Sequence, residues 1–444
     1  MALAQKEVEV GNELLTRLIE ARSQTDRLFD IVKPEALYDR PIPERHRIVF
    51  YIGHLEAFDW NLLRERVLGL DTSHPTLDNL FAFGIDPVDG GLPSDQPGDW
   101  PDISHVREYV TRTRGSLDSA LSEVVTSRRS PAQREFDTTQ LLNVAIEHRL
   151  MHAETLAYMF HQLPLERKIF QPGGSFVAAP PIKSTVIEIP SGTATLGLSR
   201  DGEIFGWDNE YEPHQQYVPA FAIERYPVSN GDYLKFMQAG GYLERSLWKT
   251  ADWEWKEQQH ISHPVFWKQV GERWLYHTMF EEVPLPLDWP VYVSHAEASA
   301  YAQWAGKSLP TEAQWHRAAY GTANPQAHQF PWGSSFPNTA RGNFDFHRWD
   351  PTPVSAFPEG QSAFGVTDLL GNGWEWTATE FSPFPGFEAF SFYPGYSANF
   401  FDGKHYVMKG GSARTAACML RRSFRNWFQP HYQYVYAGFR CVSQ

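Results

Sequence analysis

Two histidines, His148 and His152, are four residues apart in a segment whose apolar residues recur at helical spacing. On a helix this spacing places both imidazoles on one face, about one turn apart. Leu141, Ala145 and Met159 fall on the same stripe, so both imidazoles are expected to point into a helical core. A pair of inward imidazoles at this spacing is suited to holding a metal ion.

A third histidine, His54, shares a helix face with Phe50 and Phe58 in another apolar segment. A single histidine on such a face is more often a satisfied core residue, but two on one inward face and a third on another helix favour a metal site. Three neutral imidazoles with open positions suit iron(II) or zinc, and the ligand type does not choose between them. Glu154, in the pattern His-x-x-x-His-x-Glu, could orient one imidazole ligand without binding the metal itself.

Four helices are expected to position these residues. Apolar periodicity predicts helices over residues 14–29, 48–63, 106–125 and 141–160, which together form a bundle. The connection over residues 71–101 is long and rich in Gly, Pro and Asp, and loops of that length in compact domains tend to be functional or mobile. Because it follows the His54 helix, it could help to shape a pocket.

The pattern of apolar and polar residues changes after residue 171. Short stretches in which apolar and polar residues alternate, such as residues 185–189, predict strands, and Gly and Pro interrupt them. Helices are expected at 230–238, 296–304 and 311–320, the last with Thr311 as its N-cap. The fold class is therefore α+β, with a helical bundle over residues 10–170 followed by one irregular mixed domain over residues 176–444.

Charge and composition limit the partners. A formal charge of -14 over 444 residues argues against nucleic acid, whose counterions would have to be replaced by clustered Lys and Arg. Two cysteines, Cys418 and Cys441, make no disulfide framework, and no leader segment is recognised at the start of the chain. No apolar run approaches the roughly 20 residues of a membrane span. We therefore expect a cytoplasmic protein that acts on small molecules, away from membranes.

The second half carries five short motifs in a fixed order: LPTEAQW from Leu309, PWG from Pro331, LGNGWEWT from Leu370, KGGS from Lys409 and AGFR from Ala437. Any one of them is weak evidence, but five in order are specific. They resemble the formylglycine-generating-enzyme, or sulfatase-modifying-factor, domain, which implies an irregular C-type-lectin-like fold for this half.

Joined to a bundle of DinB type, this domain makes the chain similar to the ergothioneine-biosynthesis sulfoxide synthases and the related ovothiol enzymes, from about residue 13 onward. The resemblance implies a non-heme iron(II) ion, Fe(2+), held by His54, His148 and His152. It also implies an O2-dependent reaction that joins a thiol to C2 of the imidazole of hercynine, the trimethylated histidine.

The stretch SFRNWF, which begins at Ser423, matches the part of the family that holds the trimethylammonium group of hercynine. The resemblance thus assigns Asn426 and Trp427 to substrate binding. A quaternary ammonium donates no conventional hydrogen bond, so an aromatic face and an amide oxygen are suitable partners. The competing interpretation is that Trp427 only packs against a core strand.

Three departures from the family pattern bear on mechanism. Phe381 and Phe384 stand where well-studied members have tyrosines, the first of which is the acid that assists sulfoxide formation, and phenylalanine has no proton to give. Met151 replaces the Gln common between the paired histidines. Phe428 and Tyr432 replace the Asp and Arg that bind the charged ends of gamma-glutamylcysteine.

The loss of both charges argues against that donor, whose ionic groups would be desolvated without partners. A smaller donor such as cysteine, or a less charged one such as a sugar, is expected instead. The resemblance extends to selenoneine synthase, which couples a selenosugar to hercynine, and this is the first alternative. The donor is therefore a thiol or a selenol.

Two other classes of function are considered. A formylglycine-generating enzyme oxidises a protein cysteine through copper held by two cysteines, but here only Cys418 lies in a suitable region and the residue five further on is Ser423. A non-catalytic binding module is compatible with a lectin-like fold but leaves three inward histidines unexplained. The bound metal separates the three classes: iron, copper or none.

Overall fold

The computed structural model describes residues 2–443 apart from residues 73, 83, 85–91, 127–136, 172–179, 203 and 325; the side chains of residues 2–8, 125 and 126 are also outside the description. The chain divides into two compact units, Met1–Gln171 and Pro172–Gln444, and each is described by itself. Residue 176, the expected start of the second domain, lies outside the described residues.

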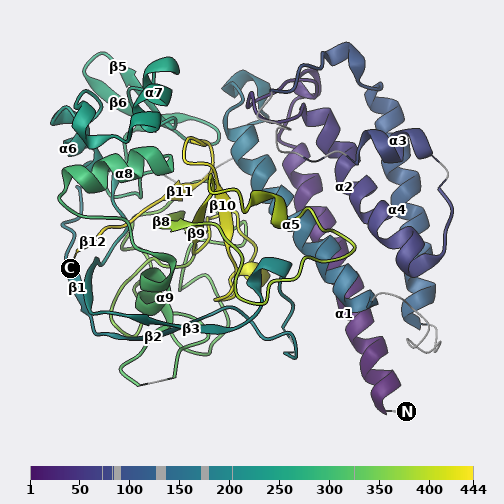
Figure 1. Ribbon diagram of the computed structural model, residues 1–444. Coiled ribbons are helices and arrows are strands. Elements are labelled where there is room, and N and C mark those ends of the chain that lie inside the picture. The colour runs from purple at the N-terminus through teal and green to yellow at the C-terminus, as the bar shows by residue number, and fades with distance from the viewer. Residues whose placement is uncertain are drawn as a thin grey trace. The chain divides into compact units, whose positions relative to one another are not determined.

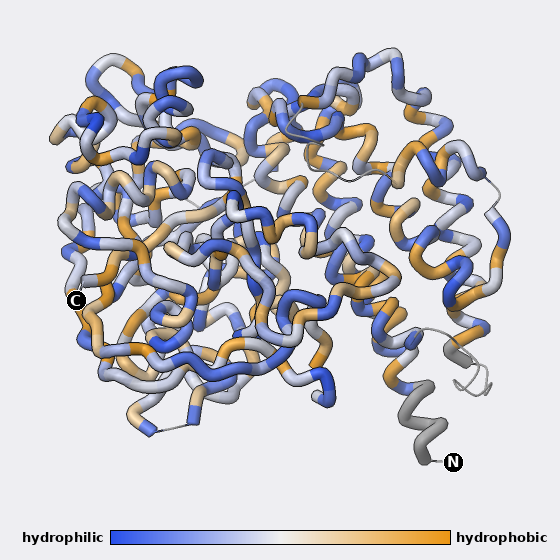
Figure 2. The backbone as a smooth tube through the Cα atoms, viewed as in Figure 1, coloured by the Kyte–Doolittle hydropathy of each residue, from blue (hydrophilic) through white to orange (hydrophobic). Residues whose placement is uncertain are grey.

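The first unit is a bundle of four long helices: α1 (Ala2–Phe29), α2 (Ile48–Leu63), α4 (Ile103–Thr126) and α5 (Thr138–His161) (Figure 1). Helix α1 packs on α5, and α2 packs on α4 and α5. Apolar and polar residues are mixed along α1 and α4 (Figure 2), whereas α2 and α5 are buried over most of their length. The four predicted helices are confirmed, and the bounds of α2 are those predicted.

The connection over residues 71–101 contains a helix that the sequence analysis did not predict, α3 (Pro75–Leu80). The buried carboxylate of Asp78 on this helix accepts hydrogen bonds from Trp60 of α2 at 3.1 Å and from Tyr109 of α4 at 2.7 Å. Asp95, further along, accepts from Arg47 at 3.0 Å and from Trp100 at 2.7 Å. The described parts of this connection are therefore anchored to the bundle at several points.

The second unit is built on small sheets. The largest has the order β10-β9-β8-β11, in which only β11 runs parallel to its neighbour β8. Its strands are β10 (Asn426–Phe428), β9 (Tyr406–Lys409), β8 (Trp374–Glu380) and β11 (Ala437–Gly438). A second sheet has the order β1-β4-β12, formed by Val186–Ile189, Phe221–Glu224 and Val442–Ser443.

In the described part of this unit, two further sheets and four α-helices accompany these strands (Figure 1). The sheets are β2-β3 (Gly192–Leu196, His214–Val218) and β5-β6-β7 (Trp267–Val270, Arg273–His277, Glu282–Pro284). The helices are α6 (Asn230–Gln238), α7 (Thr250–Gln258), α8 (His295–Trp304) and α9 (Glu312–Tyr320). Three of these helices are predicted, α7 is not, and Thr311 caps α9 in a reciprocal pair with Gln314.

The sequence motifs of this unit build its core. Glu375 of β8 accepts hydrogen bonds from Trp315 at 2.9 Å and from the Arg440 guanidinium at 2.6 and 2.7 Å, and all three side chains are buried. Gly371 and Gly410 have φ angles of 87° and 100°, which favour glycine. These motifs therefore specify the fold rather than the chemistry.

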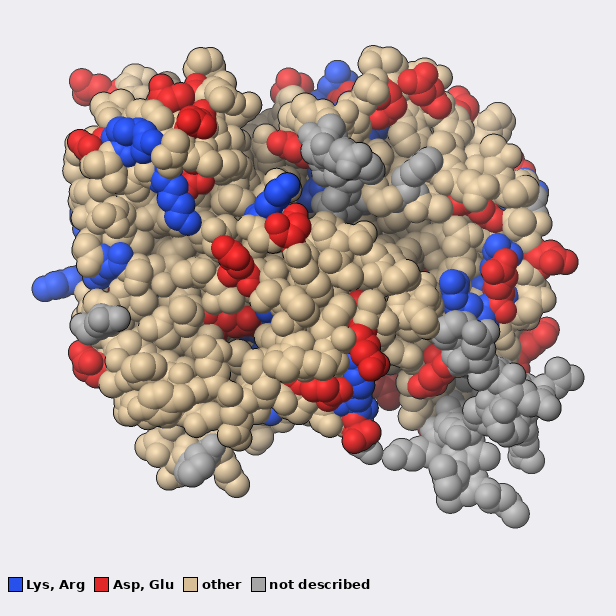
Figure 3. Space-filling model, in the orientation of Figure 1, with Lys and Arg blue, Asp and Glu red and all other residues tan. Residues whose placement is uncertain are grey.

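Charged side chains on the face shown in Figure 3 lie in small groups in which Lys and Arg are mostly next to Asp and Glu. The described residues include no helix that is long and apolar enough to cross a membrane.

Candidate metal centre

Three histidine side chains of the bundle converge on one point. The Nε2 atom of His152 lies 3.2 Å from Nε2 of His54 and 3.1 Å from Nε2 of His148. Each side chain is only 5% exposed. Among the described residues, this is the one group of three or more His, Cys, Asp or Glu side chains that could hold a metal ion.

The two helices that carry these histidines explain the convergence. His148 and His152 are one turn apart on the inward face of α5, and their ring centroids are 4.4 Å apart. His54 projects from the middle of α2, which packs against α5. The inward faces predicted from apolar periodicity are therefore the faces that bring the three imidazoles together.

The three histidines differ in the hydrogen bonds of their Nδ1 atoms, which are not the atoms that converge. Nδ1 of His54 donates to the backbone carbonyl of Phe81 at 2.7 Å, which leaves Nε2 as the nitrogen with the lone pair. The Nδ1 atoms of His148 and His152 are buried and have no hydrogen-bond partner among the described residues. The suggested role of Glu154 in orienting one of these rings is therefore wrong, because neither Nδ1 atom contacts a carboxylate.

All three imidazoles are neutral. Burial lowers the pKa of His54 to about 4, although the Phe81 carbonyl opposes the shift. Burial, and next the neighbouring imidazoles, lower the pKa values of His148 and His152 well below the ordinary value. A neutral imidazole offers the lone pair that a metal ligand needs.

The donor set fits a transition-metal ion. Two nitrogens bound to one ion at roughly 2.0–2.1 Å must lie less than about 4.2 Å apart, and the observed separations of 3.1 and 3.2 Å satisfy this condition. Three nitrogen ligands also leave coordination positions for other molecules. Imidazole suits iron, zinc, copper or nickel, so the geometry defines a metal site without identifying the ion.

Aromatic rings line the three imidazoles. Phe58 stacks on His148 with ring centroids 3.4 Å apart and planes inclined by 10°, and Phe50 stacks on His54 at 4.8 Å. The ring of Tyr51 lies 5.9 Å from that of His152. These contacts restrict ring rotation and limit access of water to the nitrogens.

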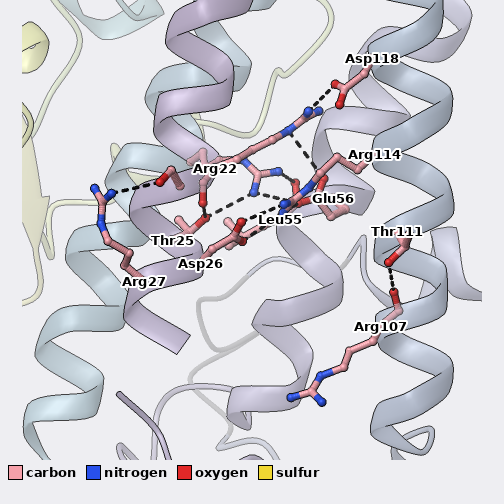
Figure 4. Close-up of polar contacts among 12 residues, drawn as sticks. Arg22, Thr25, Asp26, Arg27, Leu55, Glu56, Arg107, Thr111, Arg114 and Asp118 are labelled. Carbon is pink, nitrogen blue, oxygen red and sulfur yellow. Dashed lines mark hydrogen bonds and ion pairs between the residues drawn. The ribbon is translucent and has the colours of Figure 1, made fainter. Parts of the chain in front are cut away.

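A buried ionic cluster lies beside the histidines on the same two helices. Arg149 of α5 donates to Glu56 at 3.0 Å and to Asp59 at 2.6 Å, both on α2, and to the backbone carbonyl of Leu55 at 2.8 Å. Arg114 of α4 donates to Glu56 at 2.6 Å. Figure 4 shows the outer part of the cluster, where Arg22 and Arg114 approach Glu56.

The two carboxyl groups of this cluster differ: burial raises the pKa of Asp59 although Arg149 and Arg22 oppose the shift, whereas the arginines prevail at Glu56. Burial alone would raise the pKa of Glu56, but Arg149, Arg114 and Arg22 lower it to about 2, so the carboxylate stays ionised. Sequence reasoning missed this cluster and the Phe81 carbonyl. The available signal was the presence of Glu56 and Asp59 in an otherwise apolar helix.

The candidate substrate residues of the second unit are found around Trp427 in β10. Phe381 is 1% exposed and stacks face to face on Trp427, with centroids 4.1 Å apart and planes inclined by 6°. Tyr396 and Phe400 contact the same indole at 5.5 and 5.6 Å. The Asn426 side-chain oxygen accepts the Trp427 backbone N–H at 2.8 Å. One face of Trp427 is therefore already covered.

The remaining candidates are distributed around this region and in the bundle. Phe384 packs under the Arg425 guanidinium at 4.0 Å and against His214 at 4.4 Å. Phe428 and Tyr432 stack on one another at 4.9 Å with planes inclined by 8°. Met151 is half-buried on α5, between the paired histidines in sequence.

Both halves of the chain match known families. Residues 177–444 match the Sulfatase-modifying factor enzyme 1-like domain, and residues 17–156 match the DinB superfamily. The predicted class of fold, a DinB-type helical bundle followed by a sulfatase-modifying-factor domain, is confirmed.

Comparison with characterised proteins extends across both halves. The chain is 34% identical to a hercynine oxygenase of Mycolicibacterium thermoresistibile, over 97% of this chain and 94% of the relative. It is 27% identical to ergothioneine biosynthesis protein 1 of Neurospora crassa, over 92% of this chain and 55% of that longer protein. A formylglycine-generating enzyme of Mycobacterium tuberculosis is 30% identical, over only 45% of this chain.

The chain therefore belongs to the hercynine oxygenase family of ergothioneine biosynthesis and is an oxidoreductase.

Proposed function

We propose that this chain is a non-heme iron(II) enzyme that uses O2 to couple a sulfur or selenium donor to C2 of the imidazole of hercynine. The observation that carries the proposal is the convergence of three buried, neutral imidazole nitrogens within 3.2 Å of their neighbours. The relatives' names support hercynine as the acceptor.

His54, His148 and His152 would hold the ion. Iron(II) bound there would supply a centre that activates O2 and holds substrates on its remaining positions. The three ligands add no charge, so the ligands themselves do not repel an anionic thiolate or selenolate. The stacked rings of Phe50 and Phe58 exclude water and hold two of the imidazoles in fixed orientations.

Trp427 and Asn426 are proposed to bind the trimethylammonium group of hercynine. Phe381 covers one face of the Trp427 indole, so the cation is expected at the opposite face or at the edge near Tyr396 and Phe400. Aromatic rings are suitable there because they attract a cation that donates no conventional hydrogen bond. In this chain Phe381 and Phe384 supply no phenolic proton, so their role is to shape the site.

The donor is proposed to carry less charge than gamma-glutamylcysteine. Phe428 and Tyr432 form a stacked, uncharged pair at the positions where charged residues would bind that peptide. A sugar ring can pack on such an aromatic surface, and cysteine has one carboxylate fewer to desolvate than gamma-glutamylcysteine. Cysteine and a selenosugar are therefore the donors to test first.

Metal analysis of histidine variants tests the ligand set. His54→Ala, His148→Ala and His152→Ala are each expected to lose stoichiometric iron and turnover, whereas wild type is expected to hold about one iron per chain. His105→Ala is the matched control, because His105 is an exposed residue of α4 in the same bundle. Full iron content and activity in any of the three variants would refute the assignment.

A parallel donor assay tests the reaction. Protein loaded with iron without oxygen receives hercynine, then air, with cysteine, gamma-glutamylcysteine or a selenosugar, and products are identified by mass spectrometry. Coupling to cysteine or the selenosugar is expected, and Phe428→Asp/Tyr432→Arg is expected to gain activity with gamma-glutamylcysteine. Efficient coupling of gamma-glutamylcysteine by wild type would contradict the proposed donor class.

A further inference from the structure

We propose that Phe81 is a positioning residue of the metal centre: its carbonyl orients His54, and its ring, seated against Gly53, holds that carbonyl in place. This inference rests on the proposed metal-binding function of the three histidines. It assigns a role to residues 75–82 of the long connection, which the proposed chemistry does not use.

A hydrogen bond joins His54 to the backbone of Phe81. A backbone carbonyl only accepts, so the contact of 2.7 Å requires a proton on Nδ1 of His54 and leaves the lone pair on Nε2. Nε2 is the atom that faces His152 at 3.2 Å. The Nδ1 atoms of the other two imidazoles have no such partner among the described residues, so His54 is the ligand whose tautomer the protein fixes.

The ring of Phe81 packs against Gly53 of α2. A Cβ atom added to Gly53 would lie 2.5 Å from three atoms of this ring, so the ring occupies the space that any larger residue would need. Phe81 is 0% exposed, and Phe50, Trp100 and Tyr109 surround its ring at centroid distances of 6.3, 6.4 and 5.8 Å. The ring is therefore buried and contacted by aromatic rings as well as by Gly53.

Helix α3, which ends one residue before Phe81, is anchored to the bundle. The Phe81 N–H donates to the Leu77 carbonyl at 3.0 Å, so the residue continues the last turn of the helix. Asp78, three residues earlier, is bound by Trp60 of α2 and Tyr109 of α4. The carbonyl that orients His54 is thus tied to the helix that carries His54.

Gly53→Ala tests the proposal, with Gly98→Ala as the matched control. Gly98 lies in the same connection as Phe81, over residues 71–101, but an added Cβ at Gly98 meets nothing within 4 Å. In metal-free protein, NMR of 15N-labelled imidazoles is expected to show the Nδ1–H form of His54 in wild type and in the control, and its loss in Gly53→Ala. Cobalt(II) affinity, measured by chelator competition, is expected to fall about 10–100-fold in Gly53→Ala alone.

A second variant separates positioning from general loss of stability. Gly53→Ala/Phe81→Leu replaces the ring by a smaller apolar side chain that can pack against the new methyl group and so keep the carbonyl in place, and it is expected to recover much of the cobalt(II) affinity and the Nδ1–H form. If Gly53 and Phe81 have a purely structural role, Gly53→Ala lowers the melting temperature of the metal-free protein but leaves the His54 tautomer unchanged. The rise in melting temperature on adding metal is then also unchanged. That result, or unaltered affinity in Gly53→Ala, would overturn the proposal.

The tautomer measurement also keeps this inference apart from the proposed function. If wild type binds no metal, the proposed function fails, yet the metal-free NMR spectra still decide whether Phe81 and Gly53 fix the His54 tautomer.

Discussion

At the scale of single residues, the buried histidines of this chain fall into different kinds. His54, His148 and His152 direct nitrogen atoms at one another, whereas the Nε2 atom of His295 in α8 donates to the Thr377 carbonyl at 3.1 Å. The His295 ring also stacks on Tyr406 at 3.8 Å. His295 is thus a satisfied core histidine, the ordinary alternative for any histidine on an apolar face.

His295 provides a test of pH dependence away from the metal centre. Burial, and next the charge of Lys249, lower its pKa to about 3, below the value near 6.5 of an unfolded chain. The unfolded state therefore binds the extra proton, and stability is lost as pH falls from about 6.5 toward 3. His295→Gln can still donate a hydrogen bond to Thr377 but has no imidazole to protonate, so it is expected not to show this loss of stability as pH falls.

Urea unfolding at several pH values measures the effect. His295→Gln is expected to be less stable than wild type at pH 8, and the difference is expected to shrink by roughly 1.4 kcal/mol for each pH unit below about 6.5. A difference in unfolding free energy that stays constant from about pH 8 to 5 would contradict the assignment of His295 as a buried neutral residue.

At the scale of elements, the metal centre depends on the alignment of α2 with α5. Arg149 follows His148 in the chain and donates to the carbonyl of Leu55, which follows His54. The same guanidinium binds Glu56 and Asp59 on α2. One side chain therefore sets the register of the two helices at the turn where the imidazoles meet.

Arg149→Met is expected to lower the free energy of unfolding by about 3–5 kcal/mol, because it leaves Asp59 and Glu56 buried without this partner. Arg112→Met is the matched control, since Arg112 pairs with Glu108 on the exposed face of α4, where both side chains are more than half exposed. Its expected cost is about 0–0.5 kcal/mol. Equal costs for the two variants would show that the cluster around Arg149 does not stabilise the bundle.

At the scale of the whole molecule, metal binding and the proposed substrate contacts are divided between the two units. All three candidate ligands belong to Met1–Gln171, whereas Asn426 and Trp427 belong to Pro172–Gln444. The motifs that identify the second unit are buried in its own core, as the Glu375 and Arg440 pair shows. The second unit is therefore expected to fold without help from the metal.

Removal of the metal tests this division. A ligand that binds only the native state stabilises the elements that hold it. Chelation is therefore expected to speed amide hydrogen exchange in α2, α3 and α5 and to leave β8 and β9 nearly unchanged. Mass spectrometry of peptides from the two units measures the difference, and equal acceleration in both units would contradict it.

Local patterns in the sequence were enough to predict which elements form the bundle and which of their faces point inward. Apolar periodicity located all four long helices, and the same periodicity placed His54, His148 and His152 on inward faces. Local chemistry also predicted the Thr311 cap. The ordered motifs indicated the family, because close packing around residues such as Glu375 restricts which residues can occupy those positions.

Contacts between distant segments could not be predicted from the sequence and are seen only in the folded protein. The Phe81 carbonyl that orients His54 is a backbone group and carries no signal in residue type. The partners of Arg149, and the stacking of Phe381 on Trp427, join residues far apart in the chain whose pairing no local pattern encodes. Strand pairing in the second unit was likewise unpredicted, because its short strands pair across long sequence separations.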